Sequence, residues 1–99
     1  MLHDASTQKA LDAIPPKSKT VLYFSAPWCG PCQTVKPALE ALSEIHTDAN
    51  FVRVDVDADG DLARTHSVRG IPTVVVINAD GTGQRLSGTS IPVDITKYL

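Results

Sequence analysis

Cysteine is scarce in this chain of 99 residues, and its positive and negative charges nearly balance. Two cysteines are too few for a scaffold held by several disulfides, so the sequence favours a reducing compartment, and we expect the cytoplasm. The net charge of −2 gives no reason to expect a nucleic acid or an anionic membrane as a partner.

Long apolar stretches are also missing. No run approaches the roughly 20 apolar residues that a membrane-spanning helix needs. The first nine residues lack the basic start and apolar run of a signal peptide, so no targeting segment is expected. Internal repeats, low-complexity tracts and linkers are absent as well. A chain of this length buries roughly 65% of its unfolded surface on folding, and we therefore expect a single domain over residues 1–99.

What the chain does contain is a closely spaced pair of cysteines. Cys29 and Cys32 stand three positions apart, between an apolar run at 21–24 and a segment with helical periodicity. Unpaired N–H groups at a helix start, together with the helix dipole, favour the thiolate, which is the form that attacks disulfides. The pair can also close on itself. The pattern therefore predicts dithiol–disulfide exchange.

A structural disulfide and half of a metal site are the alternatives for this pair. A disulfide that closes so short a loop restrains the unfolded chain little. A zinc site needs about four ligands, and the three histidines show no paired ligand spacing. The acidic stretch at 55–62 matches the start of a calcium-binding loop, but His66 stands where that loop requires glutamate. We therefore expect redox chemistry and no metal.

Hydrophobic periodicity predicts an α/β chain. Strands are expected at 20–25, 51–56, 73–77 and 84–87, and helices at 30–46, at 60–67 and after residue 90. A further helix, capped by Asp4 or Ser6, is expected before Pro15. A helix separates the first two strands, which should be parallel, whereas the last two form a hairpin and should be antiparallel. Pro37 should kink the longest helix.

These residues resemble the thioredoxin family. The stretch Trp28-Cys-Gly-Pro-Cys32 matches its active-site motif, residues 68–73 match the segment that carries its cis-proline, and Gly88 matches the glycine after its last strand. The match runs from about Thr20 to Gly88, with shared order and spacing. The resemblance implies a thioredoxin-like α/β fold, with a mixed four-stranded sheet and helices on both of its faces.

The resemblance also implies a role for each residue of the motif. Cys29 is expected to attack a target disulfide as the nucleophile, and Cys32 to resolve the mixed disulfide that results. Gly30 should permit close approach of the target backbone, and Pro31 should stiffen the loop and tune its redox behaviour. Trp28 should form an apolar wall against which targets dock.

A second loop is implied to bind the substrate. The bond before Pro72 is expected to be cis and to face the sulfurs, with Ile71 offering its backbone to an extended target segment. His66 and Arg69 are expected near this loop, where they either contact partners or are simply solvated.

The implied activity is that of a protein disulfide reductase. It would act as a monomer on disulfide-containing target proteins, with no bound cofactor, and would be reduced again by an NADPH-dependent thioredoxin reductase or by a small dithiol donor. Two alternatives remain. One is a thioredoxin-fold binding subunit of a larger assembly with incidental redox activity, and the other is a glutathione-linked, glutaredoxin-like reductase.

The chain departs from the family pattern at three places. Only 19 residues precede the first matched strand, so the usual first strand is expected to be missing and the strand at 51–56 to lie at the sheet edge. Tyr23 stands six positions before Cys29, where the family has a buried acid, and Ser25 replaces an aromatic residue. Because a buried phenol is a poor base at neutral pH, we expect water or Asp55 to deprotonate Cys32, and resolution to be slow.

Overall fold

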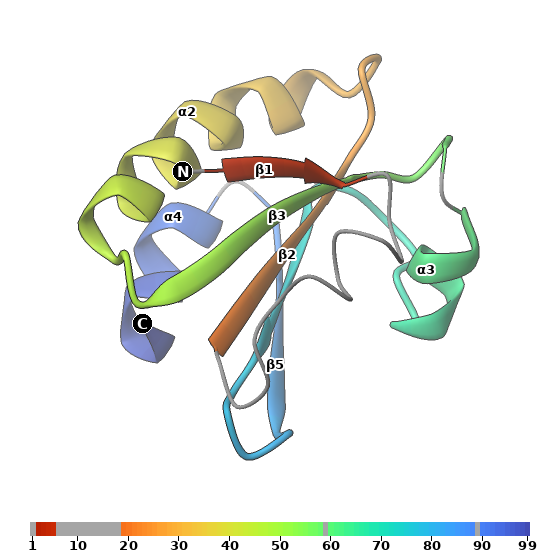
Figure 1. Ribbon diagram of the computed structural model, residues 1–99. Helices are drawn as coiled ribbons and strands as arrows, with labels where there is room; N and C mark the ends of the chain where they lie inside the picture. Colours follow the sequence, from red (N-terminus) through yellow and green to blue (C-terminus); the bar gives the residue numbers. More distant parts are fainter. Residues whose placement is uncertain (1, 6–18, 59, 89) are drawn as a thin grey trace.

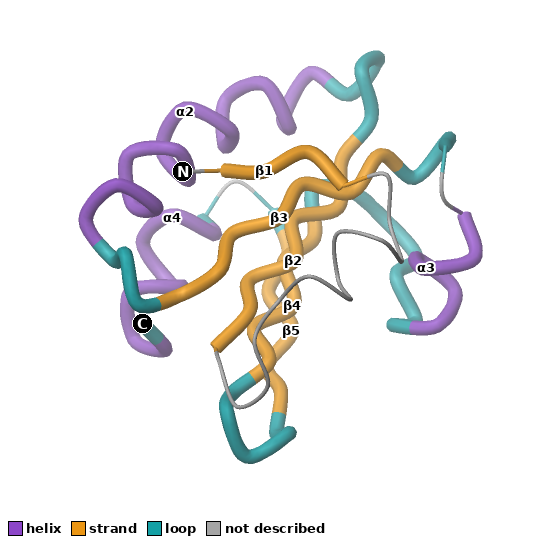
Figure 2. Tube along the Cα trace, in the orientation of Figure 1, coloured by secondary structure: helices purple, strands orange, loops and turns teal. Residues whose placement is uncertain are grey.

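A mixed β-sheet runs through the centre of the protein (Figure 1). The structure is a computed structural model that describes residues 2–5, 19–58, 60–88 and 90–99. The strands are β1 (Leu2–Ala5), β2 (Lys19–Ser25), β3 (Ala49–Asp55), β4 (Thr73–Ile77) and β5 (Gly83–Ser87), in the order β1-β3-β2-β4-β5 (Figure 2). The helices are α2 (Gly30–Ile45), α3 (Gly60–Thr65) and α4 (Ile91–Asp94), and α4 continues into a 3-10 turn over Ile95–Tyr98.

Strand β2 is the central strand of the sheet, and its side chains are buried from Thr20 to Ser25. A strand covered on both faces is an almost continuous apolar run, which is the pattern that predicted it. β2 pairs in parallel with β3 and antiparallel with β4, and β4 forms an antiparallel hairpin with β5. The predicted strand directions are therefore confirmed.

Alternate residues of β2 enter two separate cores. Val21 and Tyr23 pack in a cluster with residues of α2 and α4, whereas Leu22 and Phe24 pack in a cluster that includes Ala63 of α3. Helices α2 and α4 accordingly cover one face of the sheet and α3 covers the other (Figure 1). This arrangement confirms the predicted α/β fold with helices on both faces.

Helix α2 is the longest helix among the described residues, and its first turn carries the cysteine pair. It packs against the sheet through an apolar stripe that includes Val35 and Leu39, both fully buried. Pro37 lies within it, and the helix continues to Ile45. The buried stripe sets which face of the helix meets the sheet, and the N-cap residue Cys29 marks where the helix begins.

One prediction about the sheet is wrong. Residues Leu2–Ala5 form strand β1, which pairs in parallel with β3 from Leu2 opposite Phe51 to Ala5 opposite Val54. β3 is therefore flanked on both sides, and β1 occupies the edge position. Four residues without alternation or β-branched side chains carry no strand signal of their own, and the open ladder of β3 determines their structure instead. Asp4, one of the two predicted caps of the helix before Pro15, lies in β1 instead. The rest of that predicted helix falls on residues outside the described ranges.

Candidate active site

Four strands have an end at the same end of the sheet, which is the carboxyl end of the parallel strands β2 and β3. The parallel strands β2 and β3 both end there, with Ser25 opposite Asp55. β4 runs the other way, so its first residue, Thr73, lies at the same end opposite Phe24. β5 ends beside it, because Ser87 is opposite Thr73. The register thus brings together the loops that carry the predicted site residues, at the carboxyl ends of parallel strands where α/β proteins commonly bind ligands.

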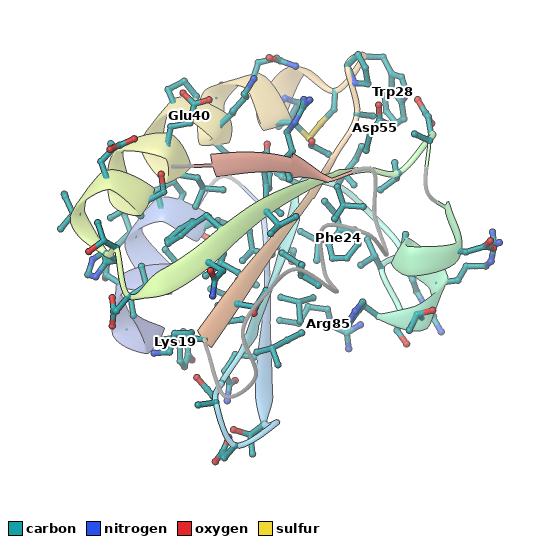
Figure 3. All side chains as sticks on the ribbon, viewed as in Figure 1. Lys19, Phe24, Trp28, Glu40, Asp55 and Arg85 are labelled. Carbon is teal, nitrogen blue, oxygen red and sulfur yellow. A yellow bond between two sulfur atoms is a disulfide. The ribbon has the colours of Figure 1, made fainter. Side chains whose placement is uncertain are left out.

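Cys29 and Cys32 form a disulfide at this end of the sheet, at the start of α2, with their Cα atoms 5.3 Å apart (Figure 3). Cys29 is the N-cap residue, and its Sγ accepts a hydrogen bond from the Cys32 backbone N–H at 3.2 Å. Cys29 is 5% exposed and Cys32 is 1% exposed. Once the disulfide is reduced, this hydrogen bond and the helix dipole favour a thiolate on Cys29.

Gly30 and Pro31, between the cysteines, are both exposed. No atom of the described chain beyond its neighbours lies within 4 Å of the place where a Cβ on Gly30 would stand. Packing inside the protein therefore does not require glycine at this position, and the open space in front of it faces solvent.

Trp28 precedes the disulfide and is 69% exposed (Figure 3). Its indole Nε1–H donates a hydrogen bond to Oδ2 of Asp57 at 2.7 Å, and the backbone N–H of Asp57 donates to Oδ1 of Asp55 at 2.9 Å. The ring is thus both exposed and tethered. Sequence reasoning missed Asp57 as a site residue, and its only signal is its place just beyond β3, at the same end of the sheet as Trp28.

The bond between Ile71 and Pro72 is cis, as predicted. Pro72 is buried, and its carbonyl accepts a hydrogen bond from the backbone N–H of Gly88 at 3.1 Å. Half-buried Ile71 packs against the cluster that contains both cysteines. Ile71 and Trp28 also line one groove of about 380 Å³ with Val56, Ala63 and Val68, which we call the apolar groove.

Tyr23 lies beneath the disulfide and is fully buried. Its hydroxyl donates a hydrogen bond to the backbone carbonyl of Cys32 at 2.7 Å. Burial raises the pKa of Tyr23 to about 12, although the charge of Arg53 and a hydrogen bond with Ser25 act in the opposite direction. The phenol therefore stays protonated at neutral pH and acts there as a hydrogen-bond donor, which makes it unsuited to remove a proton from Cys32.

His66 lies in the turn that follows α3, and Arg69 lies just after that turn. The His66 ring packs against Phe24 with 5.9 Å between ring centroids, and burial lowers the pKa of its imidazole. His66 is therefore part of the packing under the loop. Arg69 is exposed and contributes to the wall of the apolar groove.

Two further features, a metal-binding cluster and a membrane-spanning helix, are both absent from the described ranges. Among these residues no three His, Cys, Asp or Glu side chains gather in a way that could hold a metal ion. No helix in the same ranges is both long and apolar enough to cross a membrane.

Known proteins resemble this chain in sequence and in fold. The family model of thioredoxin matches residues 2–99. Human thioredoxin is 46% identical over 66 residues, which cover 67% of this chain and 62% of that protein. Thioredoxin H2 of Arabidopsis thaliana is 38% identical over 68 residues, covering 69% and 51%. The matched stretch thus spans about half to three-fifths of the length of these relatives.

The likeness extends to solved structures. A mutant thioredoxin from Halobacterium salinarum is 31% identical, with a TM-score of 0.86 over 98% of this chain and 86% of that chain. Thioredoxin NaTrxh from Nicotiana alata is 30% identical, with a TM-score of 0.81 over 97% and 90%. Because the family model and both structures cover nearly all of it, this chain belongs to the thioredoxin family.

Proposed function

We propose that this protein is a thioredoxin-type protein disulfide reductase that acts by dithiol–disulfide exchange. The observation that carries the proposal is the Cys29–Cys32 disulfide at the start of α2, with Cys32 the more deeply buried of the two. Membership of the thioredoxin family supports the same activity.

The reaction proceeds in two exchanges, starting from the reduced pair. The thiolate of Cys29 attacks one sulfur of the target disulfide, which forms a mixed disulfide and expels the other target sulfur as a thiolate. The thiol of Cys32 then loses its proton and attacks the Cys29 sulfur, so that the intramolecular disulfide forms and the second target thiolate leaves. Two electrons pass to the target, and the target thiolates take up protons from solvent.

The surrounding residues position the target. Trp28 forms an apolar wall, and Ile71 and Pro72 present the backbone along which an extended target segment lies. Gly30 leaves room for that segment, and Pro31 limits the motion of the loop and tunes its redox behaviour. The shared apolar groove of Trp28 and Ile71 supports this assignment.

The oxidised pair must be reduced again after each cycle. We assign this step to an NADPH-dependent thioredoxin reductase, and we place the protein in the cytoplasm, where a reducing environment keeps such a pair as thiols. The sulfurs and both loops of the proposed site come from one chain, so we expect a monomer to be sufficient for activity.

To test the proposal, the rate at which the protein reduces a protein disulfide is measured with two different electron donors. The expected result is turnover with NADPH and thioredoxin reductase, far slower turnover with glutathione, and none in the Cys29→Ser/Cys32→Ser variant. Faster turnover with glutathione would instead identify a glutaredoxin-like reductase. In cells, full biological activity of the double variant would identify a binding subunit.

A further inference from the structure

The cis-proline loop also lines a second groove, which is larger than the apolar groove. This basic groove, of about 650 Å³, is lined by Ser67, residues 69–73, Arg85 and residues 87–88. Residues 69–71 line the apolar groove as well, so the two grooves adjoin at the cis-proline loop. Two arginines line the basic groove, and none of its described lining residues is acidic. The groove is therefore positively charged, although the chain as a whole carries a net charge of −2.

Arg85 is held in place by neutral partners. It lies opposite Val75 in the β4–β5 hairpin, on the face of the sheet that packs against α3 (Figure 3). Its Nη1 donates to the backbone carbonyls of Ser67 at 2.8 Å and His66 at 3.4 Å. Carbonyl acceptors orient the guanidinium without neutralising its charge. Both hydrogen bonds come from Nη1, so the N–H groups on the other guanidinium nitrogens can bind an anion.

Arg69 supplies the second charge. Its side chain is exposed, and within the part of the chain that the structure describes it makes no hydrogen bond or ion pair. Arg69 is two residues before Ile71, so its charge lies close to the backbone along which a target segment is proposed to lie. Arg64, by contrast, is an exposed arginine on α3 that is already paired with Asp61.

We propose that the basic groove binds an acidic side chain of the target protein, so that segments with Asp or Glu beside the disulfide cysteine are preferred substrates. The inference rests on the proposed function, which lays the target over Ile71 and Pro72. Both of these residues also line the basic groove, so a segment that crosses them brings its neighbouring side chains within reach of the arginines. Arginine forks pair with carboxylates through two parallel N–H···O bonds, which favours Asp and Glu over polar neutral side chains.

Two disulfide-linked peptides of equal length test the preference. One carries glutamates on both sides of its cysteine, and the other carries glutamines. The measurement is the single-turnover rate of reduction of each peptide by the full reduced protein at low ionic strength. We expect the acidic peptide to be reduced about threefold to tenfold faster, and the preference to fade as salt screens the charges.

Charge variants assign the preference to the groove. Arg69→Glu should reverse the ratio of the two rates, and Arg85→Gln should lower it, whereas Arg64→Gln should leave it unchanged. A ratio near one in the wild-type protein at low salt would overturn the proposal. So would a preference that Arg69→Glu does not alter, or one that Arg64→Gln abolishes.

A binding measurement keeps this test separate from the redox proposal. The Cys29→Ser/Cys32→Ser protein is titrated with single-chain versions of both peptides that have serine in place of cysteine, and backbone amide shifts are followed by NMR. Tighter binding of the acidic peptide, with shifts around residues 69–73 and 85–88, supports the basic groove even if no reduction is observed. Equal binding of the two peptides overturns it, whatever the redox activity proves to be.

Discussion

Cys29 and Cys32 are joined by one bond, yet the two sides of their disulfide differ in construction. Exposed Trp28 directly precedes Cys29 and shares the apolar groove with the cis-proline loop; on this outer side the residues follow the thioredoxin pattern. Beneath Cys32 lies Tyr23, fully buried and bonded to the Cys32 carbonyl, where the family pattern has an acid. The comparison separates two tasks. Under the proposed function, the outer side selects which disulfides are reached, and the inner side sets how the second thiol loses its proton.

The largest expected difference concerns the reactivity of the two thiols. In the reduced protein near pH 7, iodoacetamide should modify Cys29 at least about 100-fold faster than Cys32, because the helix start favours a thiolate on Cys29 and burial shields Cys32. Mass spectrometry of peptides from a time course measures both rates. In strong denaturant the rates should become similar, which provides the control, and similar rates in the folded protein would remove the distinction between the two sides.

Alkaline unfolding tests the inner side alone. The pKa of Tyr23 is raised to about 12 in the folded protein, against about 10 in an unfolded chain. The stabilisation from the buried neutral phenol is thus fully present below about pH 10 and is lost as the pH rises toward 12. The expected loss is about 2–3 kcal/mol, roughly 100-fold in the unfolding equilibrium constant.

Urea unfolding of the wild type and the Tyr23→Phe variant, from about pH 8 to 12, measures this loss as the change in their difference. The variant should be less stable by about 1 kcal/mol near pH 8, where it lacks the hydrogen bond to Cys32. Tyr98→Phe serves as a matched control, since Tyr98 is only half-buried. If wild type and Tyr23→Phe lose stability in parallel over this range, the inner phenol does not titrate as described.

Supplying an acid beneath Cys32 should accelerate the second exchange. Without a carboxylate, resolution depends on ionisation of Cys32 itself and should speed up as the pH rises. Tyr23→Asp should increase the single-turnover decay of the mixed disulfide about tenfold near neutral pH, at a cost in stability from burying a carboxyl group. Tyr23→Asn has a similar shape but no base and is the control. If all three proteins resolve equally fast between about pH 6 and 9, the missing acid has no effect.

The smallest effect is expected from removing the hydrogen bond between Trp28 and Asp57. Asp57→Ala removes the acceptor of the indole N–H, which should free the ring and raise the KM for a protein target about threefold, the size expected for one exposed hydrogen bond. Trp28 is the only tryptophan in the chain, so its fluorescence anisotropy reports the added motion directly. Asp48→Ala changes an exposed aspartate elsewhere and should alter neither quantity. An unchanged anisotropy in Asp57→Ala would show that the tether does not hold the ring.

The features that could be predicted from the sequence are those with a strong local pattern. The apolar runs of β2 and β4, the helical stripe of α2 and the spacing of Cys29 and Cys32 each carry their own signal. The cis bond before Pro72 followed from the resemblance rather than from local chemistry.

What could not be predicted depends on contacts between distant segments. Strand β1 exists because β3 offers it a ladder, and the Trp28–Asp57 hydrogen bond spans 29 positions. The partner of the Tyr23 hydroxyl is likewise set by how α2 docks on β2. These contacts depend on how distant segments are placed against one another in the fold. Neither composition nor hydrophobic periodicity indicates that placement.

Trapping the mixed disulfide distinguishes the roles of the two cysteines most directly. Reduced Cys32→Ser and Cys29→Ser proteins are each mixed with a disulfide-containing target protein, quenched with acid and examined by non-reducing mass spectrometry. We expect a stable adduct through Cys29 in the Cys32→Ser protein and none in the Cys29→Ser protein, because in the proposed mechanism only the outer sulfur reaches a target and only the inner one releases it. Equal trapping by the two variants, or an adduct through Cys32 alone, would contradict it.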